Sequence, residues 1–245
     1  VYSNVLDGPF VFDDYSNIVG NSNMELTRIT PHGLLDAAFK SACRNRPVAN
    51  LTFGLNHYVH QYWLPGYHAV NIAVHVLTGF FLFLLIRKTL LIAGETYGSP
   101  LASRLKYPTA MAFLASLLWL MHPLNTQSVS YIVQRMTSMA GMFYVLSMLC
   151  YVRCRAAGGR PGKAAYGAGS LLAGAFALGS KEIAVTLPVF MMLYEWFFFQ
   201  DMNRKWVKRM LILIFCAGAA VTALAFLYLG VNPMERVLAQ YAGRD

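Results

Sequence analysis

The chain has 245 residues, of which 57% are hydrophobic and 13% are charged, about half of the charged fraction typical of soluble domains. Together with a mean hydropathy of +0.45, this composition excludes an ordinary soluble domain and indicates a membrane protein. The net charge of +9 does not indicate a nucleic-acid partner, because the basic residues lie in short loops between apolar runs.

Residues 1–65 are predicted to form a long outer loop, because the segment is polar to amphipathic. Turn-forming residues dominate 17–23. Apolar residues recur at helical spacing over 31–42 and again over 47–62, which predicts two amphipathic helices. Both are shorter than the roughly 20 apolar residues that cross a bilayer, so we expect them to lie at the membrane interface.

Residues 66–230 are predicted to hold six transmembrane helices, and residues 231–245 to begin a further outer segment. The apolar runs lie at 67–86, 107–121, 131–152, 164–180, 183–200 and 207–230. Three loops, 87–106, 153–163 and 204–209, carry four Lys or Arg residues each. The positive-inside rule makes that side cytoplasmic and leaves 1–65, 122–130, 180–182 and 231–245 on the outer side.

The sequence carries no nucleotide-binding loop and no metalloprotease motif, so soluble nucleotide-dependent chemistry has no support. The four cysteines predict neither a disulfide framework nor a metal site, since Cys150 and Cys154 have no histidine or second cysteine pair nearby. The first residue is Val, and we expect the chain to begin inside a longer product that includes an earlier transmembrane helix.

Two adjacent carboxylates, Asp13 and Asp14, lie between aromatic residues in the stretch FVFDDYSNIVGN. A carboxylate beside a membrane surface can serve as an acid or base toward a lipid-linked substrate. The alternative is a structural turn or an Asx cap. The sequence leaves open which of the two aspartates would act.

Further polar groups lie at the outer ends of the predicted helices, where ionisable side chains are costly unless they are paired or hydrated. Arg135 is a candidate for binding a phosphate or carboxylate, or for snorkelling to head groups. Lys181 and Glu182 form either a hairpin turn with a local ion pair or an anion site at a helix start. His122 either ends a helix or contacts substrate. His75 shares a helix face with His68 and Asn71 and is a candidate for binding substrate. The alternative for His75 is a role in helix packing.

A pocket on the outer face with one carboxylate and one or two cations suits glycosyl transfer from a polyprenyl-phosphate sugar. The carboxylate would accept the proton of the acceptor hydroxyl. Arg135 or Lys181 would bind the departing phosphate, where negative charge grows in the transition state.

The sequence resembles the bacterial relatives of the transmembrane and tetratricopeptide-repeat O-mannosyltransferases, which belong to the GT-C class of membrane glycosyltransferases. The resemblance covers most of residues 8–200. It depends on five ordered stretches: GPFVFDDYSNIVGN, RPVANLTFGLNHY, GYHAVNIAVHVLTG, WLMHPLNTQSVSYIVQRMTSMAGMFYVLSMLCY and GSKEIAVTLPVFMMLYEW.

The resemblance implies an all-α, polytopic GT-C-like module in a bacterial inner membrane, with its active face periplasmic or extracellular. It implies transfer of a hexose, with mannose expected, from a polyprenyl-phosphate donor to a protein Ser/Thr or a glycan hydroxyl. Membrane lipids and other membrane subunits are further expected partners, and no cofactor or metal is expected. The alternative is a non-catalytic GT-C-fold subunit that acts as a scaffold. The implied catalytic residues are Asp13 and Asp14, and the family pattern places His122, Arg135, Lys181 and Glu182 around the donor site. Arg46 and His75 are further candidates for binding the donor phosphate or substrate.

Overall fold

The computed structural model describes residues 2–97 and 107–229, and every regular element in these ranges is helical. The prediction of an all-α chain is therefore confirmed for this part of the chain. The chain divides into two units, Val1–Met191 and Met192–Asp245, and each is described by itself.

The outer segment contains the two short helices that apolar periodicity predicted. The Thr30 hydroxyl caps the first of them by accepting the Gly33 N–H, and each begins at a proline, Pro31 or Pro47. Proline suits this position because the first helical N–H has no partner within the helix. The helices end two or three residues earlier than predicted. The elements are η1 (Ser3–Val5), the π-helix η2 (Tyr15–Val19), η3 (Ser22–Met24), α1 (Pro31–Phe39) and α2 (Pro47–His60).

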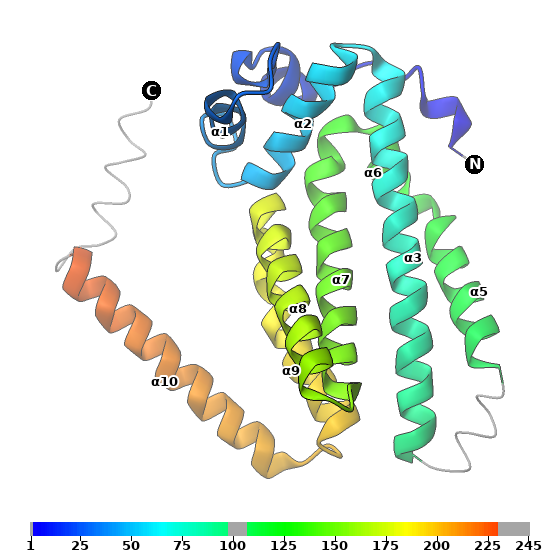
Figure 1. Cartoon of the computed structure of the whole chain (residues 1–245), viewed down its shortest axis with the longest axis vertical. Helices are drawn as coiled ribbons and strands as arrows, with labels where there is room; N and C mark the ends of the chain where they lie inside the picture. Colours follow the sequence, from blue (N-terminus) through cyan, green and yellow to red (C-terminus); the bar gives the residue numbers. More distant parts are fainter. Residues whose placement is uncertain (1, 98–106, 230–245) are drawn as a thin grey trace. The chain divides into compact units, whose positions relative to one another are not determined.

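Four long helices form the body of the first unit: α3 (Leu64–Tyr97), α5 (Pro108–Leu120), α7 (Arg135–Ala156) and α8 (Arg160–Ser180). Helix α5 packs on α3, and α7 packs between α3 and α8. Figure 1 shows these helices side by side, with α1 and α2 over one end of them. The short elements η4 (Pro123–Asn125), α6 (Gln127–Ser130) and η5 (Ile132–Gln134) connect α5 to α7.

Side-chain contacts fix the direction of the helices. The start of α5 meets the far part of α3, because Arg87 donates to the Thr109 hydroxyl at 3.1 Å. Helices α7 and α8 are antiparallel, because Cys154 donates to the Lys163 carbonyl at 3.2 Å while Ser147 and Ser170 exchange hydrogen bonds from hydroxyl to carbonyl at 2.7 and 3.0 Å. Loops that were predicted on opposite sides of a membrane therefore lie at opposite ends of these helices (Figure 1).

The predicted bounds of the three basic loops are wrong, because α7 continues to Ala156 and because α8 and α10 already begin at Arg160 and Arg204. We expected a loop from residue 87, but α3 continues through Arg87 and Lys88 to Tyr97. The residues that follow the two cations, TLLIAGETY, include good helix formers, so the charges do not end the helix. The basic residues Arg104 and Lys106 and the predicted outer segment 231–245 lie outside the described residues.

The remaining helices follow the turn at Lys181. They are η6 (Glu182–Thr186), α9 (Leu187–Phe199), which runs from the first unit into the second, and α10 (Arg204–Leu229). In the second unit, the Asn203 side chain accepts the Lys205 N–H at 2.9 Å and so caps the start of α10.

Within the described residues, two helical stretches are long and apolar enough to cross a membrane, Leu64–Glu95 and Glu182–Phe199. Helix α5 is apolar but shorter, and it exposes large side chains such as Phe113, Leu114 and Leu118. Such exposed apolar faces are typical of contact with lipid or another protein. The other predicted spans are helical, but their crossing of a membrane stays a prediction.

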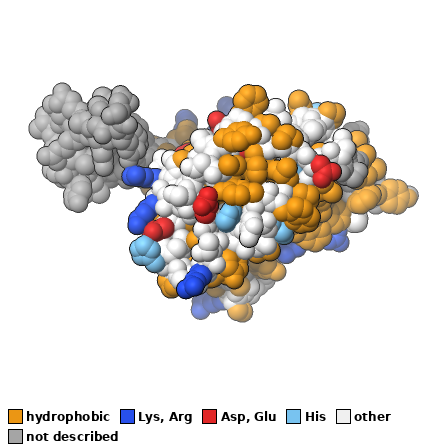
Figure 2. All heavy atoms as spheres, turned by 90° about the horizontal axis from the view of Figure 1, so that it is seen from above, with side chains coloured by type: hydrophobic (Ala, Val, Ile, Leu, Met, Phe, Trp, Pro, Cys, Tyr) orange, Lys and Arg blue, Asp and Glu red, His pale blue; other side chains and the backbone are white. Residues whose placement is uncertain are grey.

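A buried apolar core joins the acidic loop to the long helices. It includes Ile18 from η2, Phe53 from α2, Tyr67 from α3 and Ile132 from η5. Figure 2 looks onto this end of the molecule and shows charged side chains scattered among hydrophobic ones. The core holds the loop segments in place, so polar residues around it have defined positions.

Candidate active site

Asp14 lies at the start of η2 and is completely buried. Its carboxylate accepts the Val11 N–H at 2.9 Å and the Val133 N–H at 2.7 Å. The second bond crosses 119 residues and connects the acidic loop to η5, directly before α7. Burial raises the pKa of Asp14, while the two backbone bonds and nearby His68 act in the opposite direction. The structure therefore uses Asp14 to hold the loop.

Asp13 is exposed, unlike its neighbour. Its backbone N–H donates to the Tyr131 hydroxyl at 3.1 Å, and its carbonyl accepts from the Asn17 amide at 2.8 Å. The preceding residue, Phe12, has a φ of 45° and a side chain that is 85% exposed. A left-handed backbone is strained for a bulky residue and is held only by its surroundings. Asp13 thus presents a carboxylate to solvent on a fixed backbone.

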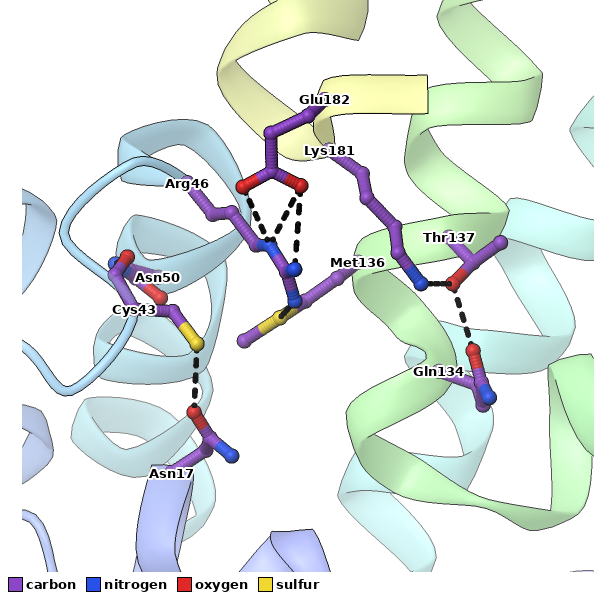
Figure 3. Close-up of polar contacts among 9 residues, drawn as sticks. All are labelled: Asn17, Cys43, Arg46, Asn50, Gln134, Met136, Thr137, Lys181 and Glu182. Carbon is purple, nitrogen blue, oxygen red and sulfur yellow. Dashed lines mark hydrogen bonds and ion pairs between the residues drawn. The ribbon is translucent and has the colours of Figure 1, made fainter. Parts of the chain in front are cut away.

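Three charged residues lie together where the start of α2 meets the end of α8 (Figure 3). Arg46 and Glu182 form an ion pair, with 3.2 Å between Nη2 and Oε2. The pair is partly solvated, because the Arg46 side chain is 25% exposed and the Glu182 side chain 53%. Figure 3 shows Arg46 and Lys181 extending on either side of Met136, whose sulfur accepts from Arg46 at 3.3 Å.

Lys181 is held by the first turn of α7. Its Nζ donates to the Thr137 hydroxyl at 2.7 Å, and that hydroxyl donates to the Gln134 side chain at 2.6 Å. Burial lowers the pKa of Lys181, and the positive charge of Arg46 lowers it further. Two cations near each other repel, so an anion that contacts both would relieve this repulsion.

Arg135 has a different environment from the one that the sequence predicted. It has no exposed surface, and its guanidinium donates to the Asn71 and Asn56 side chains at 2.7 Å each and to the Tyr67 carbonyl at 3.0 Å. It also lies over the Phe53 ring, 4.6 Å from the centroid. These contacts assign Arg135 to the interior of the protein, and its contact with a phosphate stays a prediction.

The two histidines also have partners within the protein. His75 is buried in α3 and lies 3.0 Å from the Leu120 carbonyl, next to Tyr2. His122 is exposed, and its Nδ1 accepts the Leu124 N–H at 3.3 Å at the start of η4. These contacts correspond to the helix-packing and helix-stop alternatives, and a role for either residue in substrate binding stays a prediction.

An apolar cavity of about 590 Å³ lies between α7, α8 and the start of α9. Small residues open it, among them Gly167, Gly174 and Ala175 of α8. Ala184 and Val185 of η6 line it directly after Lys181 and Glu182 in the chain. The cavity is therefore next to the charged cluster and suited to a hydrocarbon ligand.

The structure thus gathers Asp13, Asp14, Arg46, Lys181 and Glu182 at one end of the long helices. Sequence reasoning missed Thr137, which holds Lys181, and Asn56, which binds Arg135; it named Asn71 but not the contact of Asn71 with Arg135. Thr137 follows Gln134 at a spacing of one helical turn, which is a signal that could have been read. Among the residues that the structure describes, no group of three or more His, Cys, Asp or Glu side chains could hold a metal ion.

The fold and the site together define an all-helical protein with apolar helices and a charged cluster at one end. No family model matches the chain, and no solved structure matches it significantly. Curated relatives do match. Human protein O-mannosyl-transferase TMTC4 is 32% identical over 155 residues, which is 60% of this chain and 20% of the relative. The mouse protein O-mannosyl-transferase TMTC2 is 30% identical over 216 residues, 84% of this chain and 24% of the relative.

A third relative, protein O-mannosyl-transferase Tmtc3 of Drosophila melanogaster, is 28% identical over 62% of this chain. The similarities support the resemblance to the TMTC O-mannosyltransferases. The chain spans a quarter or less of the length of these relatives.

Proposed function

We propose that this chain is the part of a GT-C-type membrane glycosyltransferase that binds the donor and carries the catalytic base. The reaction would move a hexose, with mannose expected, from a polyprenyl phosphate to a Ser/Thr hydroxyl of a protein or to a glycan. The observation that carries the proposal is the exposed carboxylate of Asp13 at the same end of the helices as Arg46 and Lys181. The names of the relatives support a protein acceptor.

In the proposed reaction, Asp13 acts as the general base and Asp14 as a positioning residue. The acceptor oxygen forms a bond to the anomeric carbon of the sugar and gives its proton to the Asp13 carboxylate. The bond from that carbon to the phosphate oxygen breaks, and polyprenyl phosphate leaves. A positioned general base contributes roughly 10²–10⁴-fold to the rate of such a step.

Arg46 and Lys181 would contact the phosphate, since both are cations that Figure 3 shows extending on either side of Met136. Charge that grows on the departing phosphate is stabilised best by groups that are already in place. The apolar cavity next to them would take the isoprenoid tail. The donor is already activated by its phosphate ester, so the reaction needs no cofactor.

We further propose that the chain lies in a bacterial inner membrane, with the end of the helices that carries Asp13 and Lys181 on the outer side. Arg153 and Arg155 in the last turn of α7, together with Arg160 at the start of α8, lie at the opposite end. Their position agrees with a cytoplasmic face there. Membrane lipids and further membrane subunits complete the expected set of partners.

The second candidate is a non-catalytic scaffold with the same fold. One observation favours it, because the charged groups already satisfy one another: Glu182 pairs with Arg46, and Thr137 accepts from Lys181. A scaffold would keep these contacts and would not turn over a donor.

The test is transfer of a labelled mannose from a synthetic polyprenyl-phosphate donor to acceptor protein, with the chain in proteoliposomes. We expect Asp13→Asn to lower turnover by about 10²-fold or more while its unfolding temperature stays that of the parent. Asp14→Asn should lower stability as well, since one of its two bound N–H groups loses its acceptor. Full turnover by Asp13→Asn would end the assignment of the base, and no turnover by the parent favours the scaffold.

A further inference from the structure

His68 lies in the second turn of α3 and is completely buried. Both nitrogens of its ring lie close to a backbone carbonyl oxygen. Nε2 is 2.9 Å from the Gly8 carbonyl, and Nδ1 is 3.1 Å from the Val129 carbonyl. These distances are those of good hydrogen bonds. The ring therefore joins three parts of the chain, which are α3, the segment that leads to Asp13, and the short helix α6.

The two contacts of His68 determine how many hydrogens its ring carries. A carbonyl oxygen only accepts hydrogen bonds, so each ring nitrogen that contacts one needs its own hydrogen, and a neutral histidine has only one N–H. In a neutral ring, one nitrogen lone pair would face a carbonyl lone pair at 2.9 or 3.1 Å. Turning the ring over would place C–H groups at both carbonyls and leave both buried nitrogens without these acceptors. The imidazolium satisfies both contacts.

The surroundings supply a negative charge for this cation. Burial raises the pKa of the Asp14 carboxyl, and the positive charge of nearby His68 acts against this effect. Asp13 adds a second carboxylate on the same loop, while Arg135 of α7 and Tyr131 before η5 also interact with Asp14. Burial disfavours a charged histidine. Hydrogen bonds from a charged donor are about twice as strong as neutral ones, and His68 makes two of them beside a carboxylate.

The loop that carries Asp13 is thus attached to the long helices on both sides of this residue. Before it, the Gly8 carbonyl binds His68 of α3, and after it, the Asp14 carboxylate accepts the Val133 N–H at 2.7 Å. Glycine suits position 8, because a Cβ there would lie only 3.3 Å from Nε2 of the ring. Asp13 lies between these two attachments, so the position of its carboxylate depends on both.

We infer that His68 is a buried imidazolium that attaches the acidic loop to α3 and so acts as a positioning residue for Asp13. The role toward Asp13 rests on the proposed function, in which Asp13 is the base, whereas the charge of His68 and the attachment of the loop do not. Loss of the extra proton would break one of the two carbonyl bonds, because a neutral ring has a single N–H. The charge on His68 therefore keeps the loop in place.

The charge is tested by solid-state ¹⁵N NMR of the full chain in liposomes at neutral pH, with ¹⁵N-labelled histidine. We expect both ring nitrogens of His68 to give the signals of protonated nitrogen. His75 of the same helix is the internal control, because a neutral ring with one N–H satisfies the contact of its Nε2 with the Leu120 carbonyl. The signals of His68 are those that couple to ¹³C-labelled carbonyls of glycine and valine and that disappear in His68→Gln.

The attachment is tested by hydrogen exchange of residues 8–20, followed by mass spectrometry. His68→Gln keeps a polar side chain without the charge and should speed exchange in this segment about tenfold, as suits the loss of a charged hydrogen bond. His32→Gln, at an exposed position of α1, is the matched control and should exchange like the parent. Gly8→Ala leaves His68 unchanged but places a methyl group against its ring, and it should also speed exchange. It carries the test if His68→Gln does not fold.

In the transfer reaction, a positioning role predicts that His68→Gln lowers turnover about tenfold or more, while the Michaelis constant for the donor stays that of the parent. Two outcomes overturn the inference: an unprotonated ring nitrogen at His68 in the parent, or exchange like the parent in both His68→Gln and Gly8→Ala. Neither measurement uses a donor lipid. Absence of transfer by the parent would therefore remove the role toward Asp13 and leave the charge of His68 and the attachment of the loop in place.

Discussion

Replacing Arg135 with lysine separates a structural role for this cation from a role in binding phosphate. The lysine keeps the positive charge but loses the planar fork of donors. The guanidinium donates from Nε to Asn71 and from Nη2 to Asn56, 2.7 Å each, and also to the Tyr67 carbonyl. One ammonium group cannot reach acceptors on both sides of the fork.

The expected loss of stability follows from the acceptors that are left without a donor. One or two of them would be unpaired in a fully buried site, and each unpaired group costs roughly 1–3 kcal/mol. The burial of a positive charge is unchanged, so no gain in solvation offsets this loss. We expect Arg135→Lys to lose about 2–4 kcal/mol, or roughly 5–15 °C in unfolding temperature for a chain of this size.

The assay is thermal unfolding in detergent, followed by circular dichroism, together with the Michaelis constant for the donor in the transfer reaction. Arg153→Lys is the matched control, because Arg153 lies over the Tyr166 ring at 5.9 Å and lysine retains a cation–π contact. An Arg135→Lys variant that melts within about 2 °C of the parent but needs far more donor would refute the structural assignment.

Two further predictions concern the donor site. Ala175→Trp fills the apolar cavity and should raise the Michaelis constant for a long-chain polyprenyl donor about tenfold. The Michaelis constant for a short-chain donor should stay that of the parent. Leu172→Trp, on the same helix but outside the cavity lining, is the control. Because the pKa of Lys181 is lowered, this side chain loses its positive charge at a lower pH than an ordinary lysine, whose pKa is about 10.4. Donor binding should therefore weaken with rising pH below that value, and Lys181→Arg should move this weakening to higher pH. A profile that is the same in both proteins would exclude Lys181 as the phosphate ligand.

Much of the fold could be predicted because it depends on local signals. Prolines at residues 31 and 47 and apolar residues at helical spacing predicted α1 and α2. The predicted end of α3 is wrong, because Arg87 and Lys88 indicate a loop by their charge, whereas a helix tolerates such residues at its surface.

The site was less predictable, because its contacts join residues far apart in the chain. The acidic pair indicated a functional loop, but the buried position of Asp14 depends on a bond from the Val133 N–H, 119 residues away, which distinguishes Asp14 from exposed Asp13. The two asparagine partners of Arg135 lie 64 and 79 residues before it, on α3 and α2. No periodicity encodes such pairings, so the sequence predicted a charged side chain but not its environment.

The exchanged hydrogen bonds between Ser147 and Ser170 have a consequence for how this protein can move. Each serine is buried and donates to the carbonyl of the other, so sliding α8 along α7 would break two buried hydrogen bonds at once. The two helices therefore keep one register, and the turn at Lys181 stays opposite Thr137. A rearrangement that admits a substrate would therefore have to leave the contact between α7 and α8 in place.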